Sequence, residues 1–120
     1  MRPIILDKAE NFAVRVVKAK LYLNQQKNEF KMADQLSRSG TSIQANIAEA
    51  QYAQSKADFI SKYQIALKEA NEARNWINVL YRTEYFDKQQ YDSIYNDVNQ
   101  IVMILIAIIR KLKEKKDEDK

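Results

Sequence analysis

The stretch Ile101-Val102-Met103-Ile104-Leu105-Ile106-Ala107-Ile108-Ile109 decides the fold that this sequence predicts. It overlaps an apolar stripe in which successive residues are alternately four and three positions apart. This pattern is typical of one helix in a bundle. The stripe consists of Tyr91, Tyr95, Val98, Val102, Leu105, Ile109 and Leu112. The opposite side of the same helix presents Met103, Ile104 and Ala107, where a surface helix normally carries charged side chains. Three partner helices cover only one side, so we expect another copy of the chain to cover the other.

The same stretch is too short to predict a membrane helix. Its nine residues fall well below the roughly 20 that are needed to cross a bilayer. Residues 1–12 lack the apolar run of a signal peptide. We therefore expect a cytoplasmic protein without a membrane partner.

The composition predicts an all-α chain. Its 120 residues suffice for one domain, and they include one Gly and one Pro, too few for the turns of a β-sheet. Apolar periodicity divides the chain into four helices joined by short turns, which predicts an up-down-up-down antiparallel four-helix bundle. The bundle is expected over residues 1–113, and the charged segment 114–120 is expected to be a disordered tail.

Three side chains are expected to cap helix N-termini. Asp7, Ser55 and Asp87 each precede a helical pattern, and a second polar side chain follows three residues later, as in a capping box. The second helix is expected over residues 29–53, and the fourth is expected to end near Lys113. Gly40 lies inside the second helix, where it costs about 1 kcal/mol relative to Ala. We interpret it as a place where another backbone approaches closely, and a kink is the alternative.

The first helix, like the last, has a second apolar side. Val14, Val17 and Leu21 lie nearly opposite its core stripe. Together with Met103, Ile104 and Ala107, these three residues form the predicted oligomer interface. Trp76 on the third helix is expected either at the edge of the core or in a contact between subunits.

The residue types exclude several kinds of chemistry. The sequence has no Cys and no His, which excludes disulfides, zinc sites with thiolate or imidazole ligands, and nucleophiles activated by His. Glu69 and Glu72 do not indicate a di-iron site, because bundles of that kind pair Glu with His. The hydroxyl side chains between residues 37 and 42 lack a base to activate them. We therefore expect a non-enzymatic protein without a metal or a cofactor.

The net charge of +4 favours an anionic partner, and the basic excess is concentrated in residues 1–40 and in the last eleven residues. On the first helix, Lys8, Arg15 and Lys18 could follow phosphates, while Tyr22 offers a stacking surface. A solvated helix face that binds nothing explains the same pattern. No helix-turn-helix, zinc-finger or sheet motif for nucleic acid is visible.

A line of polar residues occupies one face of the second helix. It consists of Arg38, Ser42, Asn46 and Glu49. The pattern favours a polar network across helices or subunits, in which Arg38 pairs with a carboxylate. The alternative is contact with a ligand, and Arg38 is then a fifth candidate for binding nucleic acid.

The stretch Gln35-Leu36-Ser37-Arg38-Ser39-Gly40-Thr41-Ser42-Ile43-Gln44-Ala45-Asn46-Ile47-Ala48-Glu49-Ala50 resembles a family signature. The family is that of the four-helix-bundle proteins encoded in the intervening sequences of bacterial 23S ribosomal RNA genes. The match continues in Lys56-Ala57-Asp58-Phe59-Ile60 and in residues 65–72, and it covers residues 35–73 closely. Ala50 departs from the pattern, because the family usually has Gly there, so we expect the second helix to continue a little further.

The resemblance implies assembly more firmly than it implies a ligand. Members of this family are left-handed four-helix bundles that form homopentamers around a central channel. A related branch is the accessory protein of diversity-generating retroelements, which binds nucleic acid and a reverse transcriptase. Our leading hypothesis is thus an oligomer that binds RNA or DNA through its basic surface. The alternative is a scaffold that binds a protein, such as a reverse transcriptase, without affinity for nucleic acid.

Overall fold

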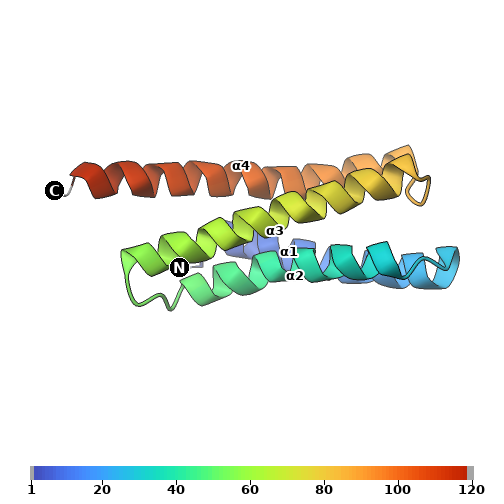
Figure 1. Cartoon of the computed structure of the whole chain (residues 1–120), viewed down its shortest axis with the longest axis horizontal. Helices are drawn as coiled ribbons and strands as arrows, with labels where there is room; N and C mark the ends of the chain where they lie inside the picture. The colour runs from blue at the N-terminus through green and yellow to red at the C-terminus, as the bar shows by residue number, and fades with distance from the viewer. Residues whose placement is uncertain (1, 119–120) are drawn as a thin grey trace.

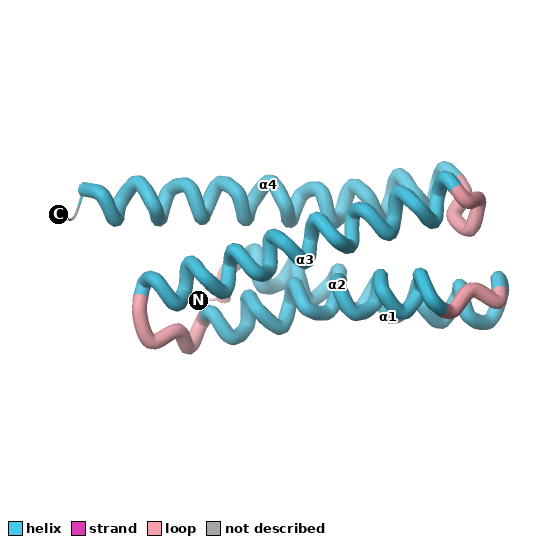
Figure 2. Tube along the Cα trace, in the orientation of Figure 1, coloured by secondary structure: helices cyan, strands magenta, loops and turns pink. Residues whose placement is uncertain are grey.

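The computed structural model describes residues 2–118, which form four α-helices and no strand. The helices are α1 (Ile4–Lys27), α2 (Lys31–Ala50), α3 (Lys56–Arg82) and α4 (Lys88–Glu118) (Figure 1). Short loops join them at alternate ends of an elongated molecule that measures 54 × 24 × 22 Å (Figure 2). The predicted all-α class with four helices is confirmed.

The four helices are arranged around the core in chain order. The backbone of α2 packs closely along α1 and along α3, and α3 packs along α4. The backbones of α1 and α4 approach one another least among the neighbouring pairs. Within residues 2–118, the diagonal pairs α1–α3 and α2–α4 do not come close. The side between α1 and α4 therefore closes the arrangement, and it is the loosest of the four sides.

The core stripe of α4 is largely the predicted one. Val98, Val102, Leu105 and Ile109 are buried, whereas Tyr91, Tyr95 and Leu112 are only partly buried. Ile94 and Ile101 are also buried, although the predicted stripe did not include them. A strict alternation of four and three describes the narrow seam of a two-stranded coiled coil, whereas a helix that packs between two neighbours buries a wider stripe. Trp76 packs against the core and is partly buried.

Gly40 marks the closest approach of α1 and α2. A Cβ added to Gly40 would lie 2.6 Å from Cγ2 of Val16, a distance that real contacts do not show. The helix α2 continues through Gly40 without a break. The interpretation of Gly40 as a site of close backbone approach is confirmed.

Two of the three predicted helix caps are present. Ser55 Oγ accepts a hydrogen bond from the backbone N–H of Asp58 at 3.0 Å. Asp87 and Gln90 form a reciprocal capping box, in which each side chain accepts from the backbone N–H of the other residue. Both interactions satisfy backbone donors that the first helical turn leaves free.

The predicted start of the first helix at Asp7 is wrong. The helix begins at Ile4 after Pro3, whose fixed φ suits a helix start and whose missing N–H costs nothing there. The side chain of Arg2 then binds Asp7 and Glu10 at 2.5 and 2.6 Å. The carboxylates that resembled a capping box therefore belong to an ion-pair cluster.

Two helix ends also differ from the expectation. The second helix is shorter than predicted. It spans Lys31–Ala50 instead of residues 29–53, so it does not continue past Ala50. The last helix continues beyond Lys113 to Glu118. Residues 119–120 of the expected tail lie outside the described residues, so disorder of segment 114–120 stays a prediction.

The segment Lys88–Glu114 of α4 is long and apolar enough to cross a membrane when only length and composition are considered, because it contains an 18-residue window with a mean hydropathy of 1.3. This reading differs from the expectation based on the nine-residue run alone. Core helices of globular proteins pass the same test, and one side of this segment packs against the other helices. The segment is therefore weak support for a membrane location.

Candidate interaction surfaces

The first candidate surface is an apolar stripe on α1, which we call the α1 stripe. Val14, Val17 and Leu21 are 51%, 42% and 50% exposed. Arg15 fixes the side of α1 that faces α4, because it pairs with Asp97. Two residues along a helix correspond to about 200° of rotation, so Val17 points away from that side. Val17 therefore lies toward α2, whereas Val14 and Leu21 point outward from the bundle, opposite the buried residues of α1.

The second candidate surface is the α4 stripe, formed by Met103 and Ile106. Met103 is 63% exposed and Ile106 is 38% exposed. Asn99, one helical turn before Met103, accepts a hydrogen bond from Arg74 of α3 at 3.0 Å. Ile106 lines a shallow hollow together with Leu67 of α3. The α4 stripe therefore lies on the face that α4 shares with α3.

The structure separates the three residues predicted on the outer side of α4. Met103 and Ala107 are exposed, but Ile104 is partly buried and packs against the core. Ile106 was missed, although it follows Met103 by three residues and so lies on the same side of the helix. Because the four helices follow one another around the core, the α1–α2 face and the α3–α4 face are opposite faces.

A ladder of tyrosines extends the α3–α4 face and was also missed. The rings of Tyr81 and Tyr91 stack at 4.3 Å, and Tyr91 and Tyr95 lie 5.3 Å apart. The Tyr91 hydroxyl donates a hydrogen bond to Asn78 Oδ1 at 2.8 Å. Burial raises the pKa of Tyr91, and the neighbouring Tyr95 contributes. The sequence pattern predicted Tyr91 and Tyr95 as core residues. The structure shows that both are only partly buried.

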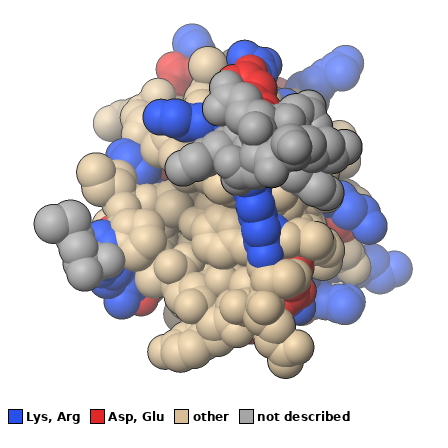
Figure 3. Space-filling view, turned by 90° about the vertical axis from the view of Figure 1, so that its left-hand side faces the viewer, with Lys and Arg blue, Asp and Glu red and all other residues tan. Residues whose placement is uncertain are grey.

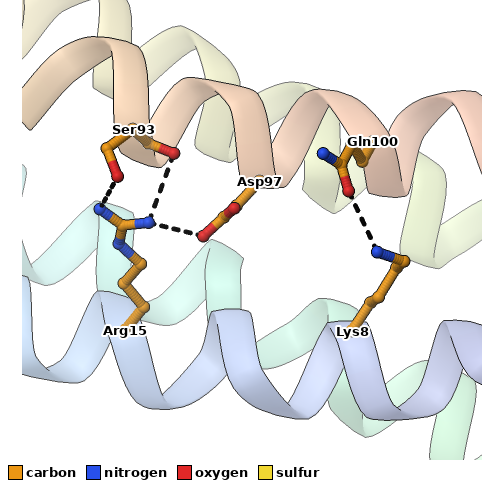
Figure 4. A network of polar contacts seen from close by, with 5 residues as sticks. All are labelled: Lys8, Arg15, Ser93, Asp97 and Gln100. Atoms are coloured by element: carbon orange, nitrogen blue, oxygen red, sulfur yellow. Dashed lines mark hydrogen bonds and ion pairs between the residues drawn. The ribbon is translucent and has the colours of Figure 1, made fainter.

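Polar side chains bridge the loose side between α1 and α4 (Figure 4). Arg15 donates to Asp97 Oδ2 and to Ser93 Oγ, both at 2.6 Å, and to the Ser93 carbonyl at 3.3 Å. We call these three residues the α1–α4 clasp. Lys8 donates to Gln100 Oε1 at 3.0 Å. Lys8 and Arg15, two of the predicted nucleic-acid-binding residues, thus hold helices together.

The remaining candidates for nucleic-acid binding lie on different faces. Lys18 is exposed and lies beside Tyr22, and both line a hollow together with Arg15. Arg38 is on α2, near Glu69 of α3. Lys and Arg side chains are spread around the rim of the end of the molecule seen in Figure 3 and do not form one patch there. The five predicted residues therefore do not form a single basic surface within one chain.

The predicted polar network on α2 consists mostly of local contacts. Asn46 Nδ2 donates to the backbone carbonyl of Ser42 at 2.8 Å. Glu49 lies 3.9 Å from Lys62 of α3, at the limit of an ion pair. Arg38 makes no ion pair in the part of the chain that the structure describes. The four residues share a face, and only Glu49 reaches across to another helix.

Glu69 of α3 is a carboxyl with a raised pKa among the described residues. Those residues include no cluster of three potential metal ligands. Burial raises the pKa of Glu69, and Glu72 adds to the shift, while Lys68 and Arg38 oppose it. A single shifted carboxyl does not by itself define a reaction.

Four packed helices without a strand among residues 2–118 define an all-α four-helix protein. Residues 2–107 match the family model of the 23S rRNA-intervening sequence protein, so the chain belongs to that family, as the motif over residues 35–73 predicted. It is similar to a protein of unknown function from the S23 ribosomal protein family of Bacteroides thetaiotaomicron. The two are 53% identical, the match covers 88% of this chain and 98% of the other, and the TM-score is 0.87. No curated protein matches the chain.

Proposed function

We propose that this protein is a non-enzymatic assembly protein that forms a closed homo-oligomeric ring. The observation that supports the ring is the position of the two exposed apolar stripes on different helices and different faces of one chain. Large apolar side chains gathered on an exposed face favour association. The α1 stripe of one copy would then contact the α4 stripe of the next.

The geometry of this contact distinguishes a ring from a dimer. An interface between two different faces is heterologous, and it leaves one unpaired face at each end of a dimer. Further copies add until the rotation between neighbours closes the ring. The family resemblance implies five copies around a channel, and the tyrosine ladder suits such an interface because aromatic residues are enriched in protein contacts.

Sedimentation equilibrium of the purified protein tests this assembly. We expect a single species with a mass of several copies at micromolar concentration. A stable monomer at that concentration would contradict the ring. Stable dimers would favour a contact of one face with itself.

We further propose that the ring binds RNA or DNA through charge rather than base recognition. The net charge of +4 and the exposed cations Lys18 and Arg38, which make no ion pair within the described residues, support this role. Lys18 lies next to the α1 stripe on the side of α1 that turns toward α4, and Arg38 lies on α2 near Glu69 of α3. Nucleic acid bound to the ring would contact one of these two surfaces.

Fluorescence anisotropy with a labelled single-stranded RNA and a labelled DNA duplex tests the binding. We expect the logarithm of the affinity to fall linearly with the logarithm of the salt concentration. Lys18→Glu and Arg38→Glu, measured separately, identify the face that is used. Absent binding at low salt, or co-purification with a polypeptide and no nucleic acid, would favour the alternative of a protein-binding scaffold.

A further inference from the structure

We propose that the hollow between α1 and α4 is a binding site for a small amphipathic anion. Such a ligand has an aromatic or short aliphatic body and one carboxylate or phosphate group. The hollow measures about 300 Å³, at the lower end of the range for ligand sites. It is lined by Arg15, Lys18, Ala19, Tyr22, Phe86 and Ile94 among others.

The hollow lies where long polar side chains bridge α1 and α4. The clasp of Arg15 with Ser93 and Asp97 spans the gap between the two helices. Long polar side chains keep the backbones apart, so the apolar residues next to the clasp are not fully covered from the other helix. Ala19 leaves further space, because its side chain is too short to reach across. A second, smaller hollow of about 170 Å³ lies next to Lys8 and Gln100.

Apolar side chains form most of the wall. Phe86 and Ile94 are each only 4% exposed, so they form a floor and not a rim. Tyr22 is partly buried and adds an aromatic ring to the wall. A flat ring or a short alkyl chain fits such a wall, because it displaces water from apolar surface.

The charged side chains that line the hollow are both cations. Asp97 and Ser93 orient the Arg15 guanidinium, and the Asp97 carboxylate partly compensates its charge. Lys18 is exposed, and within the described part of the chain it makes no ion pair and no hydrogen bond. No carboxylate lines the hollow. Lys18 is therefore the primary contact for an anionic group, and Arg15 is a secondary contact.

The site does not require the proposed assembly. Its lining residues all belong to one chain, so a monomer contains the same hollow. Lys18 lies one helical turn from Val14 and from Leu21, so one edge of the hollow borders the α1 stripe. Ligand binding can thus persist where assembly fails.

Chemical-shift mapping on the full-length ¹⁵N-labelled protein tests the site, with phenylacetate and phenyl phosphate as probes. We expect amide shifts confined to residues 15–22 and 86–94. Benzyl alcohol lacks the charge and inorganic phosphate lacks the apolar body. The affinity of each should therefore be lower than that of the anionic probes by about tenfold or by a larger factor. Binding of either anionic probe supports the site, and the tighter of the two identifies the headgroup. Shifts of equal size with inorganic phosphate, or no shifts in these segments, would overturn it.

Three variants separate a built site from general attraction. Lys18→Gln should weaken binding of the anionic probes about fivefold, and Lys31→Gln, an exposed cation on α2, should leave it unchanged. Ala19→Leu should abolish binding by filling the hollow, with the charge unaltered. Because Lys18 is exposed, its substitution leaves the fold intact and keeps the test valid if Ala19→Leu unfolds. Equal weakening by Lys18→Gln and Lys31→Gln would contradict the proposal.

Discussion

Val16 of α1 lies so close to Gly40 of α2 that a Cβ on Gly40 would come within 2.6 Å of its Cγ2 and 2.9 Å of its Cγ1. Val16 is fully buried, and its branched side chain has few rotamers to escape into. The approach of the two helices therefore depends on the absence of a side chain at position 40.

Gly40→Ala should destabilise the protein, although Ala is the better helix former. The gain in helix propensity is about 1 kcal/mol, whereas forced overpacking costs about 1–3 kcal/mol. We expect a net loss of about 1 kcal/mol, measured by urea unfolding. In a Val16→Ala background, Gly40→Ala should cost less, because the clashing methyl groups are gone. An equal loss in the presence of Val16→Ala would show that the clash is not the cause.

The caps at Ser55 and Asp87 should contribute to stability, and Asp7 should not act as a cap. Ser55→Ala and Asp87→Ala each remove an acceptor for a first-turn N–H and should cost about 1 kcal/mol. Asp7→Ala breaks only an exposed ion pair with Arg2, which solvent screens, and should cost less than the loss of either cap. Thermal unfolding of the three variants measures the difference, and a cost for Asp7→Ala equal to that for Asp87→Ala would contradict it.

The α1–α4 clasp should contribute modestly and in a salt-dependent manner. Arg15 and Asp97 are 37% and 43% exposed, so solvent screens their attraction. A double-mutant cycle with Arg15→Met and Asp97→Asn should give a coupling of about 0.5–1 kcal/mol at low salt. The coupling should shrink at high salt. A coupling that does not change with salt would indicate a contact that is not mainly electrostatic.

Glu69→Gln should stabilise the protein at neutral pH and lose its effect in acid. Burial, and next the charge of Glu72, raise the pKa of Glu69 above its ordinary value of 4.5. The folded state therefore binds the proton more readily than the unfolded state, and the ionised carboxylate destabilises the fold at pH values above the raised pKa. We expect a gain of a few tenths of a kcal/mol at pH 7. The gain should disappear as the pH falls below 4.5, and unfolding curves across that range measure it.

Periodicity in the sequence was enough to predict four helices and most of the core. Val98, Val102, Leu105 and Ile109 follow the helical repeat, and all four are buried. Local side-chain chemistry also predicted the caps at Ser55 and Asp87. It failed at Asp7, because Pro3 starts the helix earlier and Arg2 takes the carboxylate.

The candidate surfaces could be predicted only in part, because charge partners are set by the fold. Arg15 appeared as a free cation, but Asp97, 82 residues away in the chain, lies beside it in the folded molecule. Arg38 appeared to belong with the cations of α1, but it lies on another face. The sequence correctly predicted apolar residues outside the core, because apolar periodicity is a local signal. These residues include Val14, Val17 and Met103, and all three are exposed.

The central claim is that one exposed apolar stripe pairs with the other in a ring. Val17→Glu should disable the α1 stripe and Met103→Glu the α4 stripe, so each variant alone should lose the ring. Mixed in equal amounts, the two variants should form a one-to-one heterodimer, because each retains the stripe that the other lacks. Sedimentation velocity of the mixture measures this directly. A mixture that stays monomeric, or a single variant that forms stable homodimers, would contradict the ring.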